Sequence, residues 1–314
     1  MVPGGAGRES GDMTTQTSHD NGSPRHAESI DSPTIPAGSP SAAGRTILVT
    51  SATGKTGRRV ARGLAGRGAR VRSGSRTGTT RFDWTDPAGW GPALDGADSA
   101  YVSYYPDLAA PGATDAMRAF GELATAHGIR RITLLSGRGE PEAVIAEEAL
   151  RNAAPETELT VVRAAFFAQN FDEGFLAEGV ASGTIAFPAG TTAEPFVDAD
   201  DLADVIVETL TADGHAGLIH EVTGPEALTF AEAAAEISRA AGRTVTYAPM
   251  TAPEYAALLA GFGLPEPEAD WLAELFATLL DGHNTPVTDG VKRVLGRDPL
   301  PFSVYARETF ETSD

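Results

Sequence analysis

The sequence contains no cysteine, and no run in it approaches the roughly 20 apolar residues that a membrane-spanning helix needs. The absence of cysteine excludes disulfide frameworks, cysteine-bound zinc and thiol nucleophiles, and it fits a cytoplasmic location. The absence of a long apolar run leads us to expect no membrane association. Positive charge is also scarce, because 24 lysines and arginines face 43 aspartates and glutamates, a net charge of −19. Such a chain repels polyanions, so we expect no nucleic-acid partner and a small-molecule substrate instead.

The first 44 of the 314 residues differ in composition from the rest. Glycine, proline, serine and threonine make up about half of them, and almost no large apolar side chain precedes Ile47. Such a segment cannot bury enough apolar surface to fold. It also lacks the contiguous apolar core of a secretory signal. We therefore predict that residues 1–44 form a disordered tail.

From Arg45 onward, short runs of β-branched and apolar residues alternate with stretches that are typical of helices. The predicted strands cover residues 46–49, 69–72, 99–103, 131–135 and 159–162. The predicted helices between them cover residues 57–66, 87–94, 114–127 and 141–152. This alternation indicates parallel strands joined by helical crossovers, so we predict an α/β fold with a Rossmann-type, doubly wound parallel sheet.

The alternation becomes less regular after Arg163. The predicted elements there are a strand near residues 218–222 and helices at residues 229–241, 252–260 and 270–280. From His283 onward the sequence carries no pattern that we can interpret. We predict a Rossmann domain at residues 45–170 and a smaller, mixed but mainly helical C-terminal substrate-binding subdomain at residues 171–314, partly interleaved with the sheet.

The stretch from Thr46 to Arg59 is typical of a strand, a turn of small residues and the start of a helix. A dinucleotide pyrophosphate needs the backbone amides of a helix N-terminus and a turn without side chains in its path. Gly54 and Gly57 occupy two of the three positions at which this turn favours glycine, and Ser51, at the first, is expected to raise the energy of a positive-φ turn. We predict that the dinucleotide is bound by Ser51, Thr53, Gly54, Lys55, Thr56 and Gly57.

Two other interpretations of this turn compete. Gly54-Lys55-Thr56 is similar to part of a nucleoside triphosphate P-loop, but that motif needs a further glycine where Val49 lies inside the strand. A glycine turn can also simply connect a strand to a helix. The strand, turn and helix in succession favour the dinucleotide.

The end of the second predicted strand indicates which dinucleotide binds. NAD-binding proteins carry an acidic residue here for the ribose hydroxyls, whereas this chain reads Ser73-Gly74-Ser75-Arg76. Because arginine binds phosphate bidentately, Arg76 favours the 2′-phosphate of NADPH over NADH. The alternative is that Arg76 is a solvated loop charge.

With these features the chain resembles the NmrA-like family of atypical short-chain dehydrogenases/reductases, which includes quinone-reductase-like and ergot-alkaloid-type iminium reductases. The resemblance covers residues 45 to about 310. It depends on five segments, which are residues 49–57, Phe82-Asp83-Trp84, residues 134–137, residues 162–171 and residues 195–198.

The resemblance implies cofactor contacts beyond the turn. It places Asp83 and Trp84 beside the adenine, and it places Tyr104, Tyr105 and Pro106 beside the ribose and the nicotinamide. The chain departs from the family pattern at two positions on the cofactor side, which are Ser51 and Ala164, the latter standing where proline is usual.

The chain has no Tyr-x-x-x-Lys pair, because the residues four positions before its two lysines are Ser51 and Thr288. Ordinary short-chain dehydrogenases use that pair to protonate the alkoxide that forms from a ketone. An iminium ion becomes a neutral amine on reduction, and a quinone yields a stabilised anion, so neither strictly requires a strong acid. We therefore expect an NAD(P)H-dependent reductase of an iminium, a quinone or a conjugated enone.

Candidate pocket residues follow the carboxyl ends of the predicted strands, where ligands bind in open α/β sheets. The candidate catalytic residues are Tyr104, Ser136 and Asn170, with Tyr104 as proton donor. The candidate substrate-binding residues are Arg138, Phe166, Phe167 and Gln169, because aromatic and amide groups suit a flat unsaturated ligand. The alternative for the two phenylalanines is core packing, and for Asn170 it is the capping of a loop.

The aspartates between Asp198 and Asp204 do not indicate a metal site, because their pattern fits a helix start and the histidines show no ligand spacing. We expect no metal. Two functions remain open beside the reductase. One is an NmrA-like redox sensor or regulator that binds the dinucleotide without turnover, and the other is a non-redox enzyme, such as a cyclase or isomerase, on the same fold. The oligomeric state is open as well.

Overall fold

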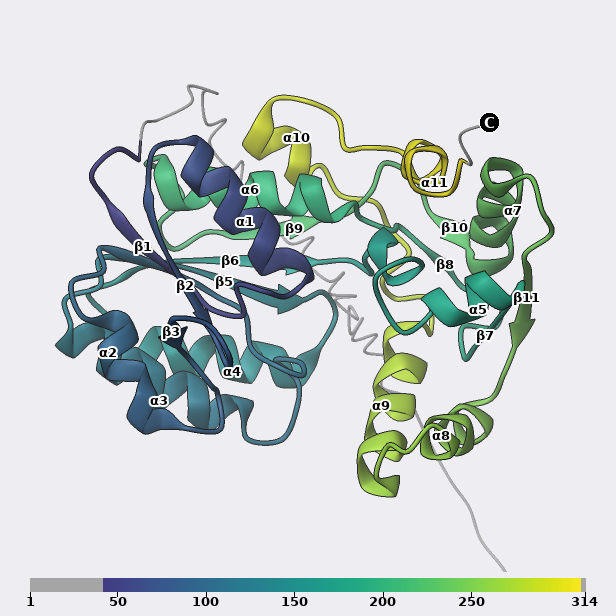
Figure 1. The fold of residues 1–314 in the computed structure, drawn as a ribbon, viewed down its shortest axis with the longest axis horizontal. Helices are drawn as coiled ribbons and strands as arrows, with labels where there is room; N and C mark the ends of the chain where they lie inside the picture. The colour runs from purple at the N-terminus through teal and green to yellow at the C-terminus, as the bar shows by residue number, and fades with distance from the viewer. Residues whose placement is uncertain (1–41, 312–314) are drawn as a thin grey trace, which may run out of the picture. The chain divides into compact units, whose positions relative to one another are not determined.

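Seven strands form one sheet in which every pairing is parallel (Figure 1). The structure, a computed structural model, describes residues 42–311, so nearly all of the expected tail lies outside the described residues. In spatial order the strands are β3 (Thr80–Arg81), β2 (Arg70–Ser75), β1 (Thr46–Val49), β4 (Ser99–Val102), β5 (Arg131–Gly137), β6 (Glu158–Ala164) and β9 (Ile219–Val222). The order reverses direction between β1 and β4, and a ligand crevice is expected at the carboxyl ends of these strands.

Helices cover both faces of the sheet (Figure 1). One face carries α1 (Lys55–Gly66), α6 (Ala199–Thr211) and α10 (Gly290–Leu295), and the other carries α2 (Trp90–Leu94), α3 (Ala113–Ala126) and α4 (Pro141–Ala153), with a short 3₁₀ turn (Pro87–Gly89) before α2. In β1, Ile47 and Val49 pack into the core beneath α1 and α6, whereas Leu48 packs into the core beneath α2, α3 and α4. Alternate side chains of a strand point to opposite faces, so both faces of this apolar strand are buried. The predicted α/β fold class is confirmed.

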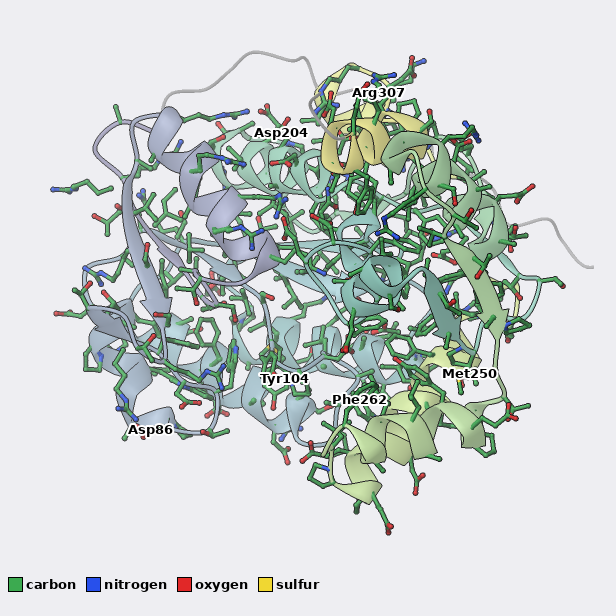
Figure 2. All side chains as sticks on the ribbon, turned by 45° about the vertical axis from the view of Figure 1, so that its right-hand side comes forward. Asp86, Tyr104, Asp204, Met250, Phe262 and Arg307 are labelled. Carbon is green, nitrogen blue, oxygen red and sulfur yellow. The ribbon has the colours of Figure 1, made fainter. Side chains whose placement is uncertain are left out.

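The rest of the chain packs around a core of phenylalanines. Its elements are a 3₁₀ turn (Ala168–Asn170), α5 (Ala177–Ser182), β7 (Thr184–Phe187), β8 (Ala193–Glu194), β10 (Leu228–Thr229), α7 (Phe230–Ala241), β11 (Thr246–Pro249), α8 (Ala252–Gly261), α9 (Glu266–Leu279) and α11 (Phe302–Phe310). β7 pairs with β11 in parallel, and β8 pairs with β10 antiparallel. Phe171, Phe187 and Phe230 are fully buried in this core. Phe262, at the tip of the α8–α9 hairpin, is exposed (Figure 2).

Several elements after residue 163 have no counterpart among those expected from the sequence. The strands β7, β8, β10 and β11 contain only two to four residues each, too few to show a periodicity. The segment after His283 contains α10 and α11. α6 and β9 return the chain to the sheet, so residues beyond 170 contribute to both parts of the molecule. None of the described helices is long and apolar enough to cross a membrane.

Candidate active site

The turn between β1 and α1 has the backbone that a bound phosphate needs. Ser51 adopts a φ of 51°, the left-handed conformation that favours glycine, and its Oγ donates a 3.1 Å hydrogen bond to Ser103 O. Gly57 lies so close to the turn that a Cβ there would stand 2.1 Å from Ser51 O. α1 begins at Lys55 after Gly54, with no capping side chain and no acidic residue in its first turn. The positive end of the helix is open to an anion, which fits the pyrophosphate of a dinucleotide.

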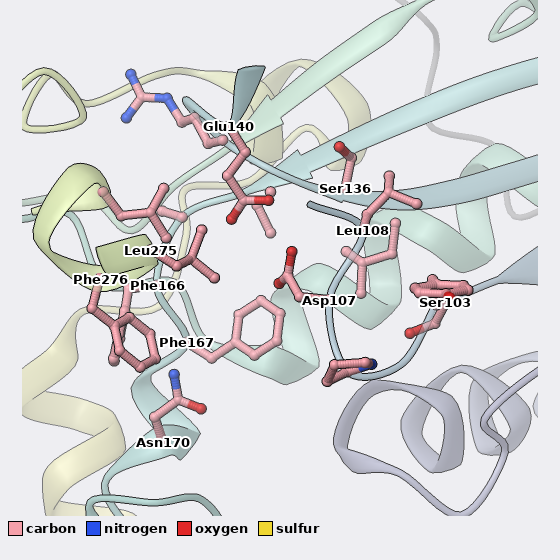
Figure 3. A pocket seen from close by; sticks show the side chains of 18 of the residues that line it. Ser103, Asp107, Leu108, Ser136, Glu140, Phe166, Phe167, Asn170, Leu275 and Phe276 are labelled. Atoms are coloured by element: carbon pink, nitrogen blue, oxygen red, sulfur yellow. The ribbon is translucent and has the colours of Figure 1, made fainter. Parts of the chain in front are cut away.

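A cavity of about 530 Å³ lies beside this turn, at the carboxyl ends of β1, β4, β5 and β6 (Figure 3). α9 covers it with apolar side chains that include Leu272, Leu275 and Phe276. The residues expected from the sequence that line the cavity are Ser51, Gly54, Lys55, Thr56, Tyr104, Tyr105, Pro106, Ser136, Arg138, Ala164, Phe166, Phe167 and Asn170. Those that do not line it are Thr53, Gly57, Arg76, Asp83, Trp84 and Gln169.

Arg76 and Tyr105 lie together just beyond the end of β2. Both side chains are exposed, and the guanidinium carbon lies 5.4 Å from the centroid of the tyrosine ring. Nearby, the carboxylate of Asp83 accepts hydrogen bonds of 3.0 and 2.8 Å from the backbone N and hydroxyl of Thr85, which lower the pKa of Asp83. The guanidinium group of Arg76 is therefore accessible to a ligand.

Trp84 is a core residue. Its indole Nε1 donates a 2.9 Å hydrogen bond to Ser103 O, and its ring packs against Phe82, Trp90 and Phe120 at centroid distances of 4.9–5.6 Å. Tyr104 packs on the same cluster, 5.1 Å from Trp84, and burial raises the pKa of its hydroxyl. Trp84 thus supports the loop that carries Tyr104 into the cavity wall.

Lys55 reaches from the turn into the cavity. Its Nζ donates a hydrogen bond to Asn170 Oδ1 and lies 5.8 Å from the centroid of the Phe167 ring. Burial lowers the pKa of Lys55 to about 8. Lys55, which the sequence predicted to bind the dinucleotide, is therefore in direct contact with Asn170, which it predicted to be catalytic.

Ser136 lines the cavity, but its hydroxyl group donates its hydrogen bond to a buried carboxylate. Ser136 Oγ donates a 2.6 Å hydrogen bond to Glu147 Oε1. Glu147 is 2% exposed, and it also accepts hydrogen bonds of 2.9 and 2.7 Å from Nε and Nη2 of Arg163. The serine can accept a hydrogen bond from a ligand, whereas its own proton is committed to Glu147.

Arg138 and Phe166 are held in place by the walls of the cavity. Arg138 donates hydrogen bonds of 3.1 Å to Glu221 Oε2 and 2.6 Å to Asn284 O, and only 9% of it is exposed. Phe166 contacts five other phenylalanine rings at centroid distances of 5.5–6.2 Å. Phe166 therefore combines the two roles that the sequence offered as alternatives, since it packs in the core and also lines the cavity.

Gln169 is turned away from the cavity toward the start of α6. Its Nε2 donates to Asp198 Oδ2 at 2.8 Å, and its Oε1 accepts from Ala199 N at 2.7 Å. Asp198 in turn accepts a 2.7 Å hydrogen bond from Asp200 N, which is the expected capping role. Within residues 42–311, no group of three or more histidines, aspartates or glutamates is arranged to hold a metal ion.

Three carboxyl groups in the cavity wall were not among the residues expected from the sequence. They belong to Asp107, Glu140 and Glu194. Burial raises the pKa of all three, to about 9 for Glu140 and about 7 for Glu194. In the sequence, Asp107 and Glu140 lie beside prolines in segments typical of solvated loops, so no local signal indicates their burial.

No family model matches the chain. A protein of Bacillus subtilis (strain 168) named "Uncharacterized oxidoreductase YesF" is 33% identical over 272 residues, which cover 83% of this chain and 93% of that protein. The chain belongs to the NmrA-like family of atypical short-chain dehydrogenases/reductases. Agroclavine dehydrogenase of Claviceps fusiformis is 27% identical to this NmrA-like chain over 285 residues, 84% of the chain and 96% of that enzyme.

A solved structure shows the same fold. The NADPH-dependent quinone oxidoreductase QOR2 of Escherichia coli, complexed with NADPH, matches with a TM-score of 0.68 and 22% identity over 84% of this chain and 100% of that one. The NmrA-like family expected from the sequence is thus confirmed, and the chain is an oxidoreductase of that family.

Proposed function

We propose that the chain is an NADPH-dependent reductase that transfers hydride to an iminium, a quinone or a conjugated enone without a Tyr-Lys pair. The observation that carries this proposal is one cavity that extends from the phosphate-binding turn at Ser51 and Gly54 to the apolar side chains of α9. A dinucleotide bound at the turn and a flat apolar substrate beneath α9 would meet in that cavity. The relatives named as agroclavine dehydrogenase and quinone oxidoreductase support this substrate range.

The residues around the turn fit a nicotinamide dinucleotide. The open N-terminus of α1 would hold the pyrophosphate, and Arg76 would bind the 2′-phosphate that distinguishes NADPH from NADH. When bound, the reduced dinucleotide supplies the hydride. In this proposal residues 45–170 bind the dinucleotide, and residues 171–314 form most of the cavity wall that faces the substrate.

The experiment that tests the function is NADPH oxidation by the purified chain with a panel of quinones, enones and iminium ions. Turnover with at least one acceptor supports the reductase. Tight NADPH binding without oxidation of any acceptor would favour a sensor, and conversion of a substrate without added cofactor would favour a non-redox enzyme.

The substitution Arg76→Ala is expected to weaken NADPH binding by roughly 10- to 100-fold, because charge-assisted hydrogen bonds contribute about 1.5–3 kcal/mol. NADH, which lacks the 2′-phosphate, should bind with nearly unchanged affinity. The measurement is a calorimetric titration of wild type and Arg76→Ala, each with NADPH and with NADH.

Arg81→Ala is the matched control for this prediction. Arg81 is another exposed arginine near Asp83, and it forms a 3.6 Å ion pair with Asp86. Its loss should affect NADPH and NADH equally and only slightly. An equal loss of both dinucleotides in Arg76→Ala would contradict the assigned phosphate contact.

A further inference from the structure

The loop after β4 and the start of α4 place two carboxyl groups face to face in the cavity wall. Figure 3 shows the carboxyl groups of Asp107 and Glu140 pointing toward one another. Asp107 is half-buried and Glu140 is 6% exposed, and both residues line the cavity. Two carboxyl groups that face each other in a buried place do not both ionise readily, because their negative charges would repel, so the pair favours a state that holds one proton.

The local backbone directs Glu140 into the cavity. Glu140 is the residue before α4, yet its side chain does not cap the helix, which begins with Pro141. The carboxyl group instead lies over Gly137 at the end of β5, where a Cβ would stand 2.0 Å from the Glu140 carboxyl carbon. No N–H or O–H group within residues 42–311 donates a hydrogen bond to the buried Glu140 Oε2. Because this oxygen is also closed off from solvent, a negative charge on the carboxyl group would be poorly stabilised.

The charges around Glu140 favour its protonated form. The groups that act on it are Asp107, Glu142 and Glu147, and all of them are acidic. The cationic groups of the cavity wall are engaged elsewhere, Lys55 with Asn170 and Arg138 with Glu221 and Asn284. Glu140 thus keeps a proton at neutral pH, on a side chain that lines the cavity.

We propose that Glu140 is the proton donor of the reaction and that Asp107 is its positioning residue. The inference rests on the proposed reductase function and extends it to the substrate class, which is a neutral conjugated carbonyl compound. When hydride adds to the substrate, the π electrons move to the carbonyl oxygen. The O–H bond of Glu140 then breaks, its electron pair stays on the carboxyl group, and the proton forms a new O–H bond on the substrate. Water returns the proton after the product leaves.

This role distinguishes two kinds of acceptor. A quinone or enone develops negative charge on oxygen and needs the proton. An iminium ion or a triarylmethyl cation is neutralised by hydride alone and does not need it. A protonated carboxyl group is also a poor counter-ion for a cation, so the pair suits the neutral acceptors.

The test compares Glu140→Gln with wild type on one neutral enone or quinone and one preformed organic cation. We expect Glu140→Gln to lower kcat/KM for the neutral acceptor by roughly 100-fold, the usual effect of a general acid, and to leave reduction of the cation nearly unchanged. Glu148→Gln is the matched control, because Glu148 is an exposed carboxylate on the same helix and is not among the groups that act on Glu140. It should change neither rate.

A second measurement does not depend on turnover. At pH 8, where Glu194 with its pKa of about 7 is mostly ionised, the infrared spectrum of wild type should contain a protonated-carboxyl band that disappears at higher pH, and Glu140→Gln should lack it. Loss of the Glu140 proton in alkali should also lower kcat/KM for the neutral acceptor. Asp107→Asn removes the neighbouring acid, so it should shift both the loss of the band and this fall of kcat/KM to lower pH. These shifts would also report on the pair if Glu140→Gln failed to fold.

The outcomes separate the two proposals. Unchanged reduction of the neutral acceptor by a folded Glu140→Gln, or a wild type without the carboxyl band, overturns the proton donor and leaves the reductase standing. A wild type that binds NADPH and shows the band but reduces neither acceptor overturns the reductase, and the proton donor with it.

Discussion

The substitution Gly54→Asp is expected to weaken NADPH binding by at least about 100-fold, which corresponds to about 3 kcal/mol, while the fold remains intact. Gly54 is the N-cap of α1, where the phosphates are expected to bind. An aspartate there would place its own carboxylate at the positive end of the helix and repel the pyrophosphate. Aspartate is also a favoured N-cap residue, so the helix itself should not be destabilised. A calorimetric titration with NADPH and a thermal melt measure the two effects.

Gly54→Ala separates charge from shape in this experiment. Either side chain introduces a Cβ about 3.1 Å from Ser51 O, a contact that a small shift of the turn can absorb. Only the aspartate adds the competing carboxylate, so alanine should cost much less affinity. Undiminished NADPH binding and turnover in Gly54→Asp would show that the turn does not hold the cofactor.

Replacing Arg163 with methionine is expected to destabilise the protein by roughly 3 kcal/mol, because it leaves a buried carboxylate without its cationic partner. Glu147 is 2% exposed, and after the substitution it would keep only the hydrogen bond from Ser136. The free energy of unfolding in urea measures the loss. Adding Glu147→Gln to Arg163→Met should recover much of it, since the neutral amide has a smaller desolvation penalty.

Arg118→Met provides the comparison at the surface. Arg118 pairs with Asp115 at 2.6 Å, but both side chains are more than half exposed, and such pairs contribute about 0–1 kcal/mol. Equal unfolding free energies for the Arg118 and Arg163 variants would mean that the buried pair does not stabilise the end of β6.

The features that the sequence predicted are those whose determinants lie close together in the chain. The turn at Ser51 to Gly57 is continuous with the strand before it and the helix after it, so its conformation and its helix terminus follow from local residue types. The regular alternation up to residue 163 similarly predicted the parallel sheet. Short strands after it, such as β8 with two residues, carry too little pattern to be found.

The chemistry of the cavity depends on partners that are distant in sequence. Asp107 and Glu140 meet only because β4 and β5 are neighbours in the sheet. The partner of the Ser136 hydroxyl is on α4, and that of Gln169 is at the start of α6. A residue type and its local context indicate that a group can bind or react, whereas its burial and its partner come from tertiary packing.

The return of the chain to the sheet limits how this enzyme can diversify. β9 forms the edge of the sheet beside β6, and α6 covers the face that contains Ile47 and Val49. In the chain, however, both elements come after residue 170, where the predicted substrate-binding part begins. A gene shortened at residue 170 would encode an incomplete sheet, so the two parts cannot be inherited or recombined as separate modules. New substrate preferences can instead arise by changes within internal segments, such as those between β6 and α6 and between β9 and α10, whose ends the sheet holds in place.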